Sequence, residues 1–152
     1  MSGRFFEDFS PGDVALTPAY EVRREEMIAF ARQWDPLPIH IDEEAARVSP
    51  HGRLIASGEY TMAVKQKLLT SKGFSDAVIG SIGYDNFRYH KPVHAGDSLR
   101  LRSECVAAVP SRSKPDRGVV TFKMTMLNQH DEPVISYLDI IMMARRPATG
   151  KE

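Results

Sequence analysis

The hydrophobic pattern of this 152-residue chain changes its period near residue 75. Before that point apolar residues recur at helical spacing, as Tyr60, Val64 and Leu68 do. After it they alternate with polar residues, most clearly in the run from Val120 to Met126. Because a period near 3.6 indicates a helix and a period of two indicates a half-buried strand, we expect helices packed on an antiparallel sheet. The predicted fold class is therefore α+β.

Three helices are predicted in the first half of the chain, over residues 24–33, 43–48 and 57–72. The first must end near Trp34, because Pro36 and Pro38 lack backbone donors and favour extended conformations in the residues before them. Residues 39–41 are then expected to be extended, and Asp42 to cap the second helix.

One strand is predicted before the helices and four after them. The first covers residues 14–22, follows an extended lead-in of about a dozen residues, and should lie at an edge or bend at Pro18, which has no donor for a ladder. The other four cover residues 77–89, 99–109, 120–126 and 134–144. Turn-rich connections of the hairpin type join the last of them. A chain of this length is expected to form a single domain, residues 1–152.

Composition excludes several classes of protein. Lys and Arg number 20, as do Asp and Glu; this balance argues against a nucleic-acid binder driven by counterion release and against a polybasic membrane-surface protein. No stretch approaches the roughly 18 apolar residues of a membrane span. The single cysteine, Cys105, excludes a disulfide framework and a cysteine-rich zinc site. Acidic residues stand where a signal peptide would have its apolar run, so a cytoplasmic protein is expected.

The most unusual segment is Asp35-Pro36-Leu37-Pro38-Ile39-His40. Its prolines stiffen a loop that carries an acid and an imidazole, which lowers the entropy cost of holding both in one place. Asp35 and His40 are therefore a candidate catalytic acid/base pair, expected within about 4–6 Å of each other and sharing one water. The alternative is structural, with Asp35 capping a backbone donor and His40 half-buried in a strand.

A second candidate site lies in Leu54–Glu59, where the longest helix begins. The first N–H groups of a helix have no intrahelical acceptor and carry partial positive charge. Gly58 would let a ligand carbonyl approach this backbone closely, so Ser57 and Gly58 are candidate substrate-binding residues for an acyl oxygen that gains negative charge. The alternative is an ordinary serine N-cap followed by Glu59 in the first turn.

Neither a metal nor a cofactor is predicted. His90 and His94 flank Lys91-Pro92-Val93, but no third ligand stands at a recognised spacing, so both are expected to be surface or turn residues. His51 lies near the second candidate site and could line the mouth of a pocket. Neither a glycine-rich phosphate loop nor a Gly-x-Ser-x-Gly elbow is present.

Together these segments resemble the MaoC-like dehydratases, also called R-specific enoyl-CoA hydratases, which are hot-dog-fold proteins. The corresponding motifs stand in order over about residues 10–145: Phe30-Ala31, the segment from Asp35 to His40, Asp42-Glu43-Glu44-Ala45-Ala46, Ile55-Ala56-Ser57-Gly58, and Phe87 followed by Pro92-Val93-His94-Ala95-Gly96-Asp97. The last of these is similar to the family pattern Phe-x-x-Pro-Val-x-x-Gly-Asp. The resemblance implies a five-stranded antiparallel sheet wrapped around a long central helix.

The resemblance also implies a function. Asp35 and His40 would be the catalytic pair, and the Gly58 N–H would polarise the carbonyl of a thioester. Water would add across the 2,3 double bond of an enoyl-CoA, or leave in the reverse reaction, while charge builds on the thioester oxygen. The implied partners are an acyl-CoA substrate and a second copy of the chain, in a homodimer or an oligomer of dimers, with no nucleic acid or membrane partner. Candidate contacts for the phosphates or pantetheine are Arg53, Lys65, Arg88 and Lys91.

Two other functions stay open at this point. In a hot-dog thioesterase, Asp35 or His40 would activate water against the carbonyl carbon, and the product would be a free thiol. A non-catalytic protein that binds acyl-CoA or an acyl carrier would use the same pocket without turnover.

The chain departs from the family pattern at three places. Leu37 replaces an Asn, Gln33-Trp34 replaces a small residue followed by Gly, and Ser57 replaces a His. Trp34 is expected to add bulk near the pocket. These changes leave the proposed acid/base pair and Gly58 in place, so they bear on the identity of the substrate more than on the class of reaction.

Overall fold

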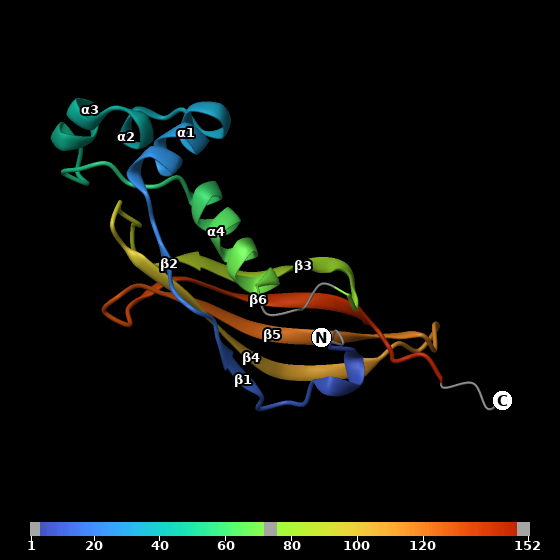
Figure 1. Ribbon diagram of the computed structural model, residues 1–152. Helices are drawn as coiled ribbons and strands as arrows, with labels where there is room; N and C mark the ends of the chain where they lie inside the picture. The colour runs from blue at the N-terminus through green and yellow to red at the C-terminus, as the bar shows by residue number, and fades with distance from the viewer. Residues whose placement is uncertain (1–3, 72–75, 149–152) are drawn as a thin grey trace.

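The computed structural model describes residues 4–71 and 76–148. One long helix lies on an antiparallel sheet, and a group of shorter helices sits at one end of it (Figure 1). The helices are η1 (a 3-10 turn, Phe6–Asp8), α1 (Arg24–Trp34), α2 (Pro38–Ile41), α3 (Glu43–Val48) and α4 (Gly58–Thr70). The strands are β1 (Val14–Leu16), β2 (Tyr20–Glu21), β3 (Val78–Tyr89), β4 (Ser98–Pro110), β5 (Arg117–Leu127) and β6 (Pro133–Ala144). The predicted α+β class is confirmed.

The main path of the sheet runs β1-β4-β5-β6-β3, with antiparallel pairing throughout, and the short β2 also pairs with β4. In the central pair, Val120 lies opposite Ile141 and Met124 opposite Tyr137. All four are buried, so a slip of one residue would turn this set to the other face. The path of five strands matches the predicted sheet, and β3 forms one of its edges.

The core lies between α4 and the sheet. Val64 and Leu68 of α4 join Val120, Met124 and Ile141 of the sheet in one cluster of buried apolar residues. This packing fixes α4 so that its N-terminus lies next to the group formed by α1, α2 and α3 (Figure 1). No helix in the described part of the chain is long and apolar enough to cross a membrane.

Most predicted elements are found close to their expected bounds, and three differ. Residues 39–41 are not extended: they belong to α2, because Pro38 stands at the first helical position, where its missing N–H costs nothing. The lead-in contains the turn η1, closed by a bond from the Phe5 N–H to the Asp8 carboxylate. The strand predicted over 14–22 is divided into β1 and β2 on either side of Pro18.

Candidate active site

The loop that follows α1 brings Asp35 and His40 together. Asp35 is the C-cap of α1, and its N–H donates to the Ala31 carbonyl at 2.8 Å. The chain then turns, with the Leu37 N–H donating to the Asp35 carbonyl at 2.8 Å, and enters the single turn of α2, which carries His40. Two short helical ends joined by a proline-containing turn therefore set the positions of both side chains.

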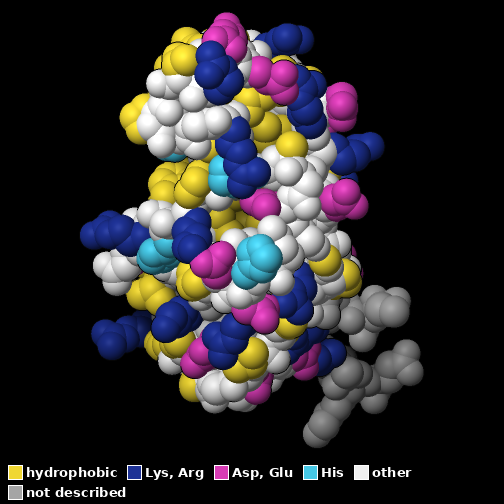
Figure 2. Space-filling model, turned by 90° about the vertical axis from the view of Figure 1, so that its left-hand side faces the viewer, with side chains coloured by type: hydrophobic (Ala, Val, Ile, Leu, Met, Phe, Trp, Pro, Cys, Tyr) yellow, Lys and Arg dark blue, Asp and Glu magenta, His cyan; other side chains and the backbone are white. Residues whose placement is uncertain are grey.

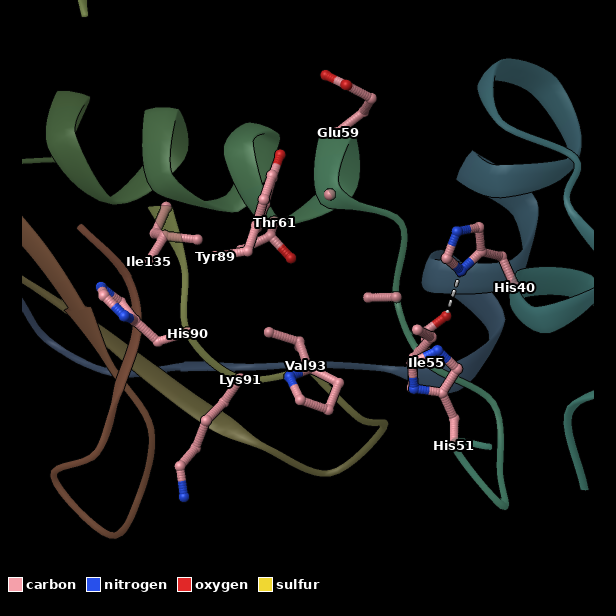
Figure 3. A pocket seen from close by; sticks show the side chains of 13 residues that line it. His40, His51, Ile55, Glu59, Thr61, Tyr89, His90, Lys91, Val93 and Ile135 are labelled. Atoms are coloured by element: carbon pink, nitrogen blue, oxygen red, sulfur yellow. Dashed lines mark hydrogen bonds between the residues drawn. The ribbon is translucent and has the colours of Figure 1, made fainter. Parts of the chain in front are cut away.

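His40 is buried, with 6% of its surface exposed, and its ring is oriented by the backbone. Its Nδ1 lies 2.8 Å from the carbonyl oxygen of Ile55 (Figure 3). A carbonyl only accepts, so Nδ1 carries a proton, and Nε2 is the nitrogen free to take one in the neutral ring. The Ile55 N–H in turn donates to the Ile39 carbonyl at 3.2 Å. Two hydrogen bonds therefore join the segment before α4 to α2, and they fix the orientation of the imidazole.

Asp35 lies against the free nitrogen of this ring. Its Oδ2 is 3.4 Å from Nε2 of His40, which is shorter than the 4–6 Å predicted and leaves no room for a water on the line between them. The separation also exceeds that of a charge-assisted hydrogen bond, about 2.7–2.9 Å. One water can still contact both atoms from the side, about 2.8 Å from each. The pair can therefore hold one water and exchange protons with it.

A cavity of about 460 Å³ opens beside His40 (Figure 3). His40, His51 and Ile55 line it on one side and Tyr89 and Ile135 on the other (Figure 3), and Gly58 is also part of the lining. The prediction that His51 lines a pocket is confirmed. Asp35 is not part of the lining and meets the cavity through His40. Its carboxylate is 28% exposed.

The start of α4 forms part of the cavity wall. The Ser57 hydroxyl accepts from the Tyr60 N–H at 3.0 Å, and Ser57 is fully buried outside the lining. Its side chain is thus the N-cap of α4, and a role in substrate binding stays a prediction. Gly58 lines the cavity at the first position of the helix. The Gly58 N–H has no acceptor within the helix, which makes this end of α4 suited to a partly negative oxygen.

Positively charged residues lie beside the cavity. Figure 2 shows a hollow with a hydrophobic floor, bordered by histidine and by Lys and Arg side chains. A second depression of about 350 Å³ shares Lys91 and Pro92 with the first, and Arg53, His94 and Glu132 also line it. Lys91 pairs with Glu132. Burial, followed by the charge of Arg53, lowers the pKa of His94, so His94 adds no charge at neutral pH. Of the predicted phosphate contacts, Lys91 lines both the cavity and the second depression, and Arg53 lines the second depression.

Two residues lie elsewhere than expected. Lys65 is not a surface contact: it is buried under α4, and its Nζ donates to the Tyr84 hydroxyl and to Gln66, each at 3.0 Å. Trp34 is 66% exposed and is not in the cavity lining, so it adds no bulk there. Trp34 shares the helical face of the buried Met27 and Ala31 but is the last residue of α1, and Lys65 lies on the buried face of α4 with Val64 and Leu68.

Sequence reasoning missed Tyr89. The family pattern Phe-x-x-Pro places an aromatic residue three positions before the proline. In this chain that position is Tyr89, whereas Phe87 lies five positions before Pro92. Tyr89 lines the cavity, whereas Phe87 packs against Tyr89 and Tyr137. Counting back from Pro92 would have found it.

Known proteins share this architecture. A double-hotdog protein from Mycobacterium tuberculosis superposes on 99% of this chain, and on 47% of its own, with a TM-score of 0.76 at 20% identity. That likeness identifies the fold as a hot dog. The MaoC like domain model matches residues 8–126, and the MaoC-like dehydratase from Rhodospirillum rubrum superposes with a TM-score of 0.89 at 36% identity, over 96% of this chain and 100% of that one. The chain belongs to the MaoC-like domain family.

Among the curated relatives is the uncharacterized protein YdeM of Bacillus subtilis, which is 30% identical over 84% of this chain and 90% of its own length. A mesaconyl-CoA hydratase from Cereibacter sphaeroides is 31% identical over 95% of this chain. This chain spans 42% of the length of that hydratase.

Proposed function

We propose that this protein is a hydratase or dehydratase that adds water to the 2,3 double bond of an enoyl-CoA thioester, or removes it. The observation that carries the proposal is the position of the Asp35–His40 pair, which lies beside a cavity whose lining also includes the start of α4. A water activator and a site for a thioester oxygen then face the same space. The name of the mesaconyl-CoA hydratase relative agrees with this reaction class.

In the proposed reaction, the thioester oxygen accepts a hydrogen bond from the Gly58 N–H. A water held by Asp35 and His40 forms a C–O bond at C3 as it gives up a proton to the pair. The electrons of the double bond move toward the thioester oxygen, where the partial positive charge of the helix end stabilises them. The pair then returns a proton to C2, so the net change is the addition of H and OH.

The remaining features of the proposal concern the rest of the substrate and the assembly. Arg53 and Lys91, which line the depression that adjoins the cavity, are the proposed contacts for CoA phosphates, because these cations can pair with phosphate oxygens. The proposed assembly is a homodimer joined along β3.

The test is the hydration of crotonyl-CoA, followed by the loss of absorbance of the conjugated thioester. Asp35→Asn and His40→Ala should each lower kcat at least about 100-fold, the scale of a lost acid/base group. Asp116→Asn is the matched control, since Asp116 is an exposed carboxylate bonded to its neighbour Arg117 in the β4–β5 connection.

Three outcomes would contradict the proposal. Full activity in both variants would remove the acid/base role of the pair. Release of free thiol without hydration would indicate a thioesterase. Tight binding of acyl-CoA with no turnover by the wild-type protein would indicate a binding module.

A further inference from the structure

The hydroxyl of Tyr89 lies directly over the first residue of α4. A Cβ atom built on Gly58 would stand 2.5 Å from Tyr89 Oη and 2.7 Å from its Cζ. The phenol therefore packs against the Cα of Gly58, within the same cavity. Figure 3 shows the side chain of Tyr89 extending from β3 toward the start of α4. This contact also explains why position 58 carries no side chain.

The ring of Tyr89 is supported, and its hydroxyl is available. Tyr89 is the last residue of β3, paired with Ile135 of β6, and its ring meets Phe87 edge-on with centroids 4.8 Å apart. Within residues 4–71 and 76–148, no hydrogen bond to its Oη is found, and 55% of the residue is exposed. Burial, and to a smaller degree Glu59, raise the pKa of Tyr89, so the phenol keeps its proton at neutral pH. It is thus a free donor held beside the helix end.

We propose that Tyr89 is a second hydrogen-bond donor to the thioester oxygen, acting together with the Gly58 N–H. The proposal rests on the proposed function and extends it. Both donors reach the same small region, because the phenol contacts the Cα of the residue that supplies the N–H. In the reaction Tyr89 keeps its proton throughout: its O–H bond points at the oxygen that gains charge and stabilises the enolate-like state more than the substrate.

Replacing Tyr89 by Phe separates hydrogen bonding from packing. The similar family pattern has Phe three residues before the proline, so Tyr89 differs from it only by the hydroxyl. Tyr89→Phe therefore removes the proposed donor and keeps the ring that packs on Gly58. A role limited to packing would survive this change, whereas a role in hydrogen bonding would not.

The first measurement is steady-state hydration of crotonyl-CoA. Tyr89→Phe should lower kcat about 10- to 100-fold, the range expected for one donor to a developing charge, with little change in KM. Tyr20→Phe is the matched control, because Tyr20 is a phenol outside the cavity, bonded to Glu26, and its kcat should stay at the wild-type value. Circular dichroism should give the same spectrum for all three proteins.

The second measurement reports on the hydrogen bond itself. Cinnamoyl-CoA is a conjugated thioester whose absorbance moves to longer wavelength when its carbonyl is polarised. Bound to Asp35→Asn, which suppresses turnover, it should show a red shift, and the double variant with Tyr89→Phe should show a smaller one. Wild-type kcat in Tyr89→Phe, or an unchanged red shift, would overturn the proposal while leaving hydration intact. A wild-type protein that does not hydrate crotonyl-CoA, yet shows a red shift that depends on Tyr89, would instead refute the proposed function alone.

Discussion

At the scale of single residues, hydrogen bonds to the backbone orient the side chains of the candidate site. The Ile55 carbonyl accepts a hydrogen bond from Nδ1–H of His40, and this orients the ring so that Nε2 faces Asp35. A backbone hydrogen bond also fixes the Ser57 side chain, whose hydroxyl accepts from the Tyr60 N–H. In both residues a bond to the backbone uses one polar atom or lone pair and fixes the direction of the rest of the group.

Ser57 provides a prediction at this scale. Ser57→Ala should lower the free energy of unfolding by about 1–2 kcal/mol, because the buried Tyr60 N–H loses its acceptor. The value of kcat should stay near that of the wild type. Urea denaturation and the crotonyl-CoA assay check both parts. Thr70→Ala, an exposed change at the other end of α4, should cost less than about 0.5 kcal/mol. A large rise in KM at unchanged stability would instead assign the Ser57 hydroxyl to substrate binding.

At the scale of elements, charges tie the two ends of the described chain together. Glu7 of η1 accepts from Arg145 Nε at 2.9 Å and from the Arg146 N–H at 3.0 Å, just beyond β6. These contacts, with the side-chain bond to Arg145 first, lower the pKa of Glu7 to about 2. The carboxylate therefore binds its proton less readily in the folded protein than in the unfolded chain.

Because the pKa of Glu7 is lower in the folded protein than in the unfolded chain, the stability of the protein depends on pH. A lowered pKa in the folded state stabilises the protein above the unfolded value of 4.5, and that contribution is lost as the pH falls toward about 2. Glu7→Gln should lower the free energy of unfolding by about 1 kcal/mol or less at pH 7, since the group is partly exposed and screened. The difference from wild type should shrink below pH 4.5. Urea denaturation between pH 7 and pH 3 measures this difference in the free energy of unfolding, with the exposed Glu21→Gln as control. A difference that is constant with pH would contradict the role assigned to Glu7.

At the scale of the whole molecule, β3 leaves an open edge. It is a 12-residue strand that, within the part of the chain that the structure describes, has one neighbour in the sheet, β6, and its side chains are exposed along most of its length. Ile79, Ile82 and Tyr84 are among the exposed large hydrophobic residues, with Ile82 at 56%. Long apolar edges of this kind pair with another chain unless something covers them. The proposed homodimer joins two sheets along this strand.

The oligomer is tested by sedimentation at micromolar concentration. The wild-type protein should be a dimer, and Ile82→Lys should shift it toward monomer, because the lysine would place a charge on the paired edge. Val109→Lys, an equally exposed position near the end of β4, should leave the dimer intact. A wild-type monomer would contradict the proposed assembly.

Local pattern determined much of this protein. The change of period near residue 75 separates the helices from the last four strands, and Asp42 caps α3 through the N–H groups of Glu44 and Ala45. The proximity of Asp35 and His40 was also predictable, because prolines restrict a loop of only a few residues. In each case the residues that interact lie within a few positions of one another, so the feature can be predicted from the local sequence.

Contacts between distant segments decided the rest. The tautomer of His40 depends on Ile55, the place of Tyr89 on Gly58 depends on the end of β3 meeting the start of α4, and the burial of Lys65 depends on Tyr84 across the core. No local spacing encodes these pairs, since each forms only when α4 lies on the sheet. Residue types and their order thus determined which groups could act, and packing determined which of them meet.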